Sequence, residues 1–122
     1  MKFNFYHTSI AVLDLDKSIQ FYQEALGFTE VRRIAADDGS YIFVFLNCEG
    51  SNAQLELAWY KDRKIPWNLG DTDTHLGFRA DDFEAAKEHH EKMNCICSVN
   101  EKLGVYFIKD PDGYKVEIVP TR

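Results

Sequence analysis

Apolar residues recur along this chain with two different periods, which separate predicted strands from predicted helices. Runs such as Gln54–Trp59 alternate apolar and polar positions, as expected for strands whose successive side chains face opposite sides. Leu15, Ile19, Tyr22 and Leu26 instead follow helical spacing, and Gly27 stands where a left-handed residue ends a helix. The pattern predicts strands at about 5–12, 29–34, 41–46, 54–59, 75–79, near 96, 105–108 and 115–119, with helices at about 16–26 and 83–93.

The two halves of the chain repeat each other. His7-x-x-Ile10-x-x-x-Asp14 aligns with His75-x-x-Phe78-x-x-x-Asp82, and each half continues into a helix and three further strands. The aspartates are candidate helix N-caps, although Asp81 is an alternative for the second helix. We therefore predict an α+β fold of two βαβββ modules, residues 1–60 and 74–122, joined by a linker at 61–73 and forming one domain.

Four side chains carry the candidate chemistry: His7, Glu56, His75 and Glu117. Each lies in a predicted strand on the face opposite the apolar residues. A polar residue on an outer strand face is usually solvated, but chance residues do not respect a repeat, and each half supplies one His and one Glu. Two imidazoles and two carboxylates form a plausible octahedral site for a divalent first-row metal, with positions open for water or substrate.

Composition narrows the function classes. The 122 residues have a formal net charge of −6 and no basic stripe, which argues against nucleic acid as a partner. The longest strongly apolar run, Tyr41–Leu46, is too short to span a bilayer, and no N-terminal signal is visible. The three cysteines lack metal-like spacing, and Cys95 and Cys97 are predicted to be small core residues. A reducing cytoplasm is the predicted location.

Several motifs together resemble glyoxalase I (lactoylglutathione lyase) of the vicinal oxygen chelate superfamily. The resemblance covers nearly the whole chain. It rests on the paired modules, the His7-Thr8 strand, Ser18-Ile19-x-Phe21-Tyr22 with Leu26-Gly27-Phe28, Glu56-Leu57, His75-Leu76, and Asp110-Pro111-Asp112-Gly113-Tyr114-x-Val116-Glu117. The final motif is common to many superfamily members, whereas the His/Glu/His/Glu set is more specific.

This resemblance implies curved mixed sheets that form a metal-binding cup. It also implies isomerisation of a hemithioacetal, formed from methylglyoxal and a thiol, into a lactoyl thioester. One divalent ion per site is expected, held by His7, Glu56, His75 and Glu117; the resemblance favours nickel or cobalt and leaves zinc open. By similarity, Glu117 is the principal base, and Glu56 is a ligand that can serve the opposite prochiral face. Chains of this length commonly form homodimers in which two subunits share each site.

The chain departs from glutathione-using relatives at two positions. Ala11 stands where those relatives typically carry Arg, and Tyr60 where they often carry Asn. Arg32, Arg33 and Arg79 are possible substitutes for the missing cation, or are simply solvated strand residues. A different thiol therefore stays open. So do two other functions: another metalloenzyme of the superfamily, either an epimerase or a thiol transferase, and a metal-free binding module for a small molecule.

Overall fold

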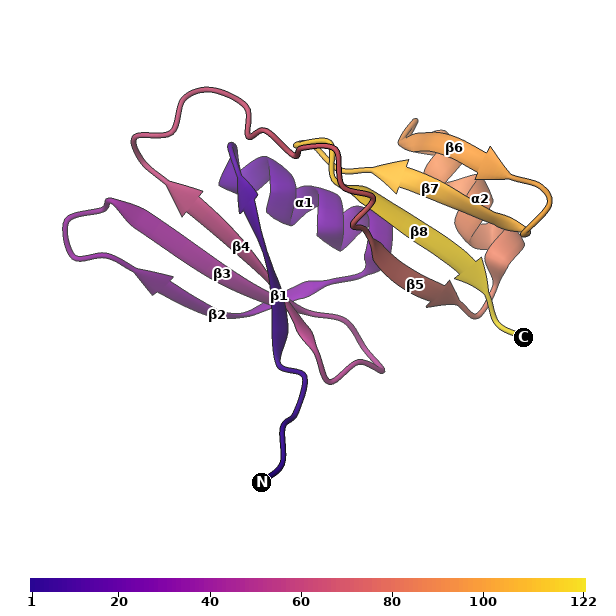
Figure 1. The fold of residues 1–122 in the computed structure, drawn as a ribbon, viewed down its shortest axis with the longest axis horizontal. Coiled ribbons are helices and arrows are strands. Elements are labelled where there is room, and N and C mark those ends of the chain that lie inside the picture. Colours follow the sequence, from indigo (N-terminus) through magenta and orange to yellow (C-terminus); the bar gives the residue numbers. More distant parts are fainter. The chain divides into compact units, whose positions relative to one another are not determined.

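The computed structural model describes residues 1–122, which divide into two compact units, Met1–Trp67 and Asn68–Arg122. Each unit contains one four-stranded mixed sheet and one helix (Figure 1). The predicted α+β fold of two βαβββ modules is therefore confirmed.

The first unit places its first strand beside its last. Its elements are β1 (His7–Val12), α1 (Leu15–Leu26), β2 (Thr29–Ala35), β3 (Tyr41–Asn47) and β4 (Gln54–Tyr60). The strand order is β1-β4-β3-β2, with β1 parallel to β4 and the other pairs antiparallel. Because β1 reaches β4 only through α1 and two strands, residues far apart in sequence become neighbours along this parallel pair.

The second unit repeats this topology. Its elements are β5 (Leu76–Ala80), α2 (Phe83–Lys92), β6 (Ile96–Asn100), β7 (Val105–Lys109) and β8 (Lys115–Pro120). The strand order is β5-β8-β7-β6, and β5 is parallel to β8. Each module thus brings its first and last strands together in the same way.

Equivalent residues begin and end the two helices. The Asp14 side chain accepts a hydrogen bond from the Lys17 backbone N–H, and Asp82, rather than Asp81, accepts one from Ala85. After α1, Gly27 adopts φ +71°, and after α2, Asn94 adopts φ +56°. Both chain reversals therefore use the left-handed region, the first of them at the glycine that the sequence indicated.

One face of each sheet is buried under its helix. In the first unit α1 packs on β4, and in the second α2 packs on β8. The buried strand residues include Ile10, Val12, Leu55 and Leu57 in the first unit and Tyr106, Ile108, Val116 and Ile118 in the second. The alternate positions, which carry the candidate ligands, consequently lie on the opposite face.

Three local details differ from the sequence-based expectation. The first strand begins at His7 rather than Phe5, because its partner β4 begins at Gln54, which pairs with His7. His75 lies immediately before β5 rather than inside it. Cys97 is exposed rather than in the core, because it is the extra residue of a bulge between Ile96 and Ser98.

Neither helix has the length and apolar character that crossing a membrane would require.

The turn between β7 and β8 is organised by Asp110, which is only 5% exposed. Its Oδ1 accepts hydrogen bonds from the backbone N–H groups of Asp112 and Tyr114, each at 2.9 Å. Gly113 adopts φ +92°, a conformation that favours glycine. The turn fixes where β8 begins and therefore where Glu117 lies.

We expect Asp110→Ala to lower the free energy of unfolding by about 1–3 kcal/mol, because it leaves two part-buried N–H groups without their acceptor. Asp110→Asn retains an acceptor oxygen, so its free energy of unfolding should fall clearly less. Urea denaturation of the three proteins measures both differences. Equal stability of Asp110→Ala and the unsubstituted protein would contradict this account of the turn.

Candidate functional site

The first unit places His7 and Glu56 together on its open sheet face. Along the parallel β1–β4 pair, Ser9 lies opposite Glu56, and His7 lies two residues before Ser9 on the same face. His7 Nε2 is 3.9 Å from Glu56 Oε1. Neither side chain is fully buried, so the pair is accessible from solvent.

The second unit repeats this arrangement with His75 and Glu117. Gly77 lies opposite Glu117 along the parallel β5–β8 pair, and His75 lies two residues before Gly77. His75 Nε2 is 3.6 Å from Glu117 Oε1. Gly77 takes the place of Ser9, and a Cβ atom at Gly77 would lie 3.6 Å from Glu117 Oε1. The carboxylate of Glu117 thus has a neighbour without a side chain.

An aromatic ring supports each His–Glu pair from the next strand. Phe45 on β3 lies opposite Glu56, and its ring meets the His7 ring edge-on at a centroid distance of 5.6 Å. Phe107 on β7 lies opposite Glu117 and meets His75 in the same way at 5.1 Å. Sequence reasoning missed both phenylalanines in this role. The repeat contained the signal, since each Phe stands in the strand before the Glu.

The His–Glu distances fit ligands of a shared cation better than a direct hydrogen bond. Separations of 3.9 and 3.6 Å are too long for a good hydrogen bond. Two ligands that each lie about 2.0–2.2 Å from one ion are separated by at most about 4.4 Å. Both pairs fall within that span.

The other ring nitrogens of the histidines differ between the units. His75 Nδ1 lies 3.1 Å from the backbone oxygen of Asp73, so the ring donates there and leaves Nε2 with its lone pair toward Glu117. His7 Nδ1 is buried and has no hydrogen-bond partner. A buried imidazole nitrogen without a partner is costly. An ion at Nε2 would not supply that partner, so His7 lacks the second hydrogen bond that orients His75. The fit to a divalent metal rests on the two imidazoles, the two carboxylates and the two His–Glu distances.

The structure shows two pairs rather than a complete site. Neither unit gathers three or more His, Cys, Asp or Glu side chains in a position to hold an ion. The structure brings His7 together with Glu56, and His75 together with Glu117. The assembly of all four residues around one metal stays a prediction.

The positions that depart from the glutathione-binding pattern lie on the same face as the first pair. Ala11 follows His7 by four residues along β1, and Tyr60 follows Glu56 by four along β4. Neither supplies a cation. Tyr60 is 39% exposed, and its ring contacts the rings of Phe43 and Trp67.

Two of the three arginines considered as substitutes lie in the first unit. Arg33 is paired with Glu30 through two hydrogen bonds, and the hydrogen bonding to Glu30 raises the pKa of its guanidinium. Arg32 donates to the Tyr6 hydroxyl at 2.6 Å and covers the Phe45 ring, with Cζ 4.2 Å from the ring centroid. Arg32 is exposed to solvent, yet it also lies against the aromatic wall beside His7.

Comparison with known proteins places the chain in a family. The model of the Glyoxalase/Bleomycin resistance protein/Dioxygenase superfamily matches residues 4–118. The chain belongs to this superfamily. It is 33% identical to a probable lactoylglutathione lyase of Synechocystis sp. over 94% of this chain and 93% of that protein. It is 31% identical to a lactoylglutathione lyase of Haemophilus influenzae over 95% of this chain and 91% of that protein.

Among solved structures, the chain resembles the trypanothione-dependent glyoxalase I of Leishmania major. The two superpose with a TM-score of 0.86 at 29% sequence identity, covering 98% of this chain and 87% of the other. The predicted resemblance to glyoxalase I-like proteins is thereby confirmed, and the named relatives support an enzyme of the lyase class.

A glyoxalase-superfamily chain with this donor set should bind about one divalent ion per chain. We expect titration calorimetry of chelator-treated protein with nickel, cobalt, zinc and manganese to show that stoichiometry for at least one of them. His7→Ala and His75→Ala should each weaken the tightest-binding ion at least about tenfold. His89→Ala, which changes an exposed histidine on α2, is the control. Equal affinity in all four proteins would rule out these ligands.

Proposed function

We propose that this protein isomerises the hemithioacetal of methylglyoxal and a small thiol to a lactoyl thioester, as a metal-dependent glyoxalase I-like lyase of methylglyoxal detoxification. The observation that carries the proposal is the pair of equivalent His–Glu sets, His7 with Glu56 and His75 with Glu117, at one register on the two open sheet faces. The names of the relatives support the same activity.

The reaction moves a proton between two adjacent carbons, so it needs a base and stabilisation of negative charge. A divalent ion held by His7, Glu56, His75 and Glu117 would supply the Lewis acidity for the two vicinal oxygens. Glu117 takes the proton from one carbon and returns it to the other. Gly77 leaves space beside Glu117 Oε1 for that movement. Glu56 is proposed as a ligand and as the base for the opposite prochiral face.

The donor set also guides the choice of metal. Two imidazoles and two carboxylates, without a thiolate, suit borderline divalent ions of the first transition row. Nickel or cobalt is our proposed metal, and zinc is the alternative. We further propose that the protein works in a reducing cytoplasm, which is consistent with its three free cysteines.

The half-site in each unit is consistent with a site shared in a homodimer, as the resemblance to glyoxalase I implies. Each unit offers one imidazole and one carboxylate, so a four-ligand site requires two units. We propose that His7 and Glu56 of one subunit meet His75 and Glu117 of the other. A two-fold dimer then contains two equivalent sites.

We expect Glu117→Gln to lower kcat at least about a hundredfold, because the amide cannot accept the proton that the carboxylate moves. Metal content, measured by elemental analysis, should fall much less. Glu101→Gln removes an exposed carboxylate from the turn between β6 and β7 and should leave kcat unchanged. Nearly full activity of metal-loaded Glu117→Gln would assign the base to another residue. If no hemithioacetal is turned over by the unsubstituted, metal-loaded protein, the proposed reaction is wrong.

Mixed dimers test the shared site. His7→Ala and Glu117→Ala homodimers should both be nearly inactive, since each of their sites lacks a ligand. In the heterodimer both lesions fall in one site and the other keeps four native ligands, so up to about half of the activity should return. Differently tagged subunits allow isolation of verified heterodimers after refolding. Heterodimers without recovered activity would contradict sharing between subunits.

A further inference from the structure

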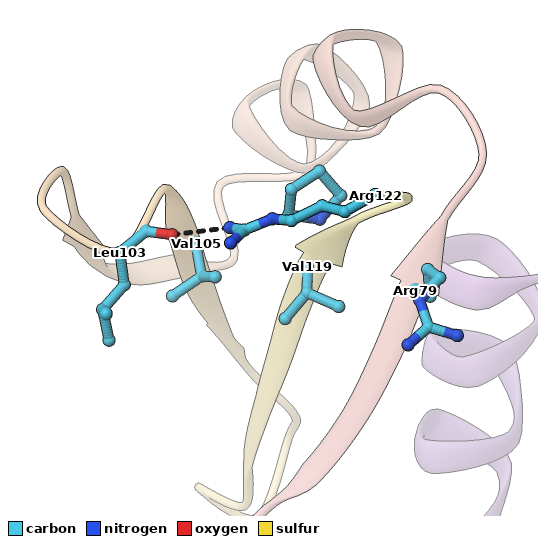
Figure 2. Close-up of a pocket in the computed structure, with 6 residues that line it drawn as sticks. Arg79, Leu103, Val105, Val119 and Arg122 are labelled. Carbon is cyan, nitrogen blue, oxygen red and sulfur yellow. Dashed lines mark hydrogen bonds between the residues drawn. The ribbon is translucent and has the colours of Figure 1, made fainter.

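A cavity in the second unit contains two arginines that the proposed metal chemistry does not use. Its volume is about 330 Å³, and it is lined by Arg79, Leu103, Val105, Val119, Pro120 and Arg122 (Figure 2). No acidic side chain lines it. The cavity combines concentrated positive charge with apolar walls, which is typical of a site for a small organic anion.

The cavity lies on the sheet face that carries His75 and Glu117. Arg79 pairs with Val119 across the parallel β5–β8 pair, and these residues follow Gly77 and Glu117 by two positions. Residues two apart on a strand share a face and are separated by about 7 Å. The cavity therefore lies next to Glu117 on the same sheet face, close enough for one small molecule to contact both.

The two guanidinium groups are available for an anion. In Figure 2, Arg79 and Arg122 lie on either side of Val119. Arg122 Nη2 donates to the backbone oxygen of Leu103 at 2.7 Å, which holds this side chain in place and leaves further N–H groups. The ion pairs of the structure are His7–Glu56, Arg33–Glu30, His75–Glu117 and Lys92–Glu88, so neither cavity arginine is neutralised by a carboxylate.

The backbone around the cavity is fastened at the ends of the two parallel strands. Thr121 Oγ1 donates to the backbone oxygen of Ala80 at 2.9 Å, which ties the segment after β8 to the end of β5. Arg79 precedes Ala80, and Arg122 follows Thr121. This bond therefore holds together the two backbone segments that carry the arginines, which limits the backbone entropy lost when a ligand binds.

In the internal repeat, Arg79 is the equivalent of Ala11. It follows His75 by four residues, just as Ala11 follows His7 by four, and both lie in the strand parallel to the Glu-bearing strand. The first unit thus has a small apolar residue where the second has a cation. The cation that is absent at position 11 of the first unit is present at the equivalent position 79 of the second.

We propose that Arg79 and Arg122 bind the carboxylate of the substrate's thiol portion, so that the preferred thiol is a small carboxylic acid with a short apolar arm. Bidentate pairing with guanidinium selects a carboxylate over a neutral group of similar size. Val105 and Val119 contact the arm, and the sulfur end reaches toward Glu117. This inference deepens the proposed lyase function and rests on it for the identity of the ligand.

Binding can be tested without turnover by using 3-(ethylthio)propanoate, an inert thioether acid, and its neutral amide as probes in titration calorimetry. The acid should bind the protein more tightly than the amide. Arg79→Gln combined with Arg122→Gln should lower the affinity for the acid at least about tenfold and leave the affinity for the amide unchanged. Arg33→Gln, which removes the same charge from the Glu30 pair of the first unit, should change neither.

Arg79→Gln alone controls for misfolding of the double variant, because Arg122 then keeps its hydrogen bond to Leu103. This single variant should still bind the acid severalfold more weakly. The proposal is overturned if the acid binds no better than the amide. It is also overturned if the Arg79 and Arg122 variants bind the acid as tightly as the unsubstituted protein, or if Arg33→Gln lowers the affinity for the acid as much as they do.

Kinetics separate this proposal from the lyase function itself. With methylglyoxal and 3-mercaptopropionate, the double variant should have a kcat/KM at least about tenfold lower, because its KM rises. With 2-mercaptoethanol as the thiol, its kcat/KM should not change. If both thiols are turned over and the arginine substitutions change neither rate, the lyase function is supported and the carboxylate site is overturned. Arginine-dependent binding of the acid without turnover of either thiol would support the anion site and overturn the lyase function.

Discussion

The parallel pairing of the first and last strands of each module is the constraint on which the rest of the structure depends. It brings His7 beside Glu56 and His75 beside Glu117, although 48 and 41 positions lie between the partners. A shift of one residue in this register would turn the acid or the imidazole toward the helix-covered face. The burial of Leu55, Leu57, Val116 and Ile118 resists that shift, because it would expose these side chains to water. Core packing and site geometry are therefore fixed by the same pairing.

Duplication of the module explains much of the site, and the differences between the copies explain the rest. The shared parts are the His–Glu register, the supporting Phe45 and Phe107 rings, and the aspartate caps. The copies differ in the residues beside this frame: Arg32 covers Phe45 in one, whereas Arg79 and Arg122 line a cavity in the other. The common frame suits a common metal chemistry, and the differing surroundings suit recognition of a substrate that is itself asymmetric.

The sequence predicted the elements, the helix caps and the two faces of the strands because these depend on local periods and on single residues such as Asp14 and Gly27. It could not predict the bulges in β2 and β6, which place Val31 and Cys97 outside the regular alternation. The bulge before Arg32 brings that residue opposite Phe45, a contact that no periodic pattern contains. The anchoring of Arg122 to Leu103 was also hidden, since it joins a loop to the segment after the last strand. The repeat marked the four His and Glu positions in the sequence, whereas nothing in it indicated that Arg122 lies beside Arg79 in one cavity.

The glycine opposite Glu117 has a consequence for how the two carboxylates can diverge. Ser9 and Gly77 occupy the same place in the two copies, yet only Gly77 has no side chain beside its carboxylate. Two acids with identical register can thus differ in freedom of movement through a neighbour that never touches the substrate. A duplicated protein can assign the mobile role to one copy and the fixed role to the other by exchanging a single small residue, without altering any ligand. Catalytic asymmetry in such a fold would then be invisible to a comparison of the ligands alone.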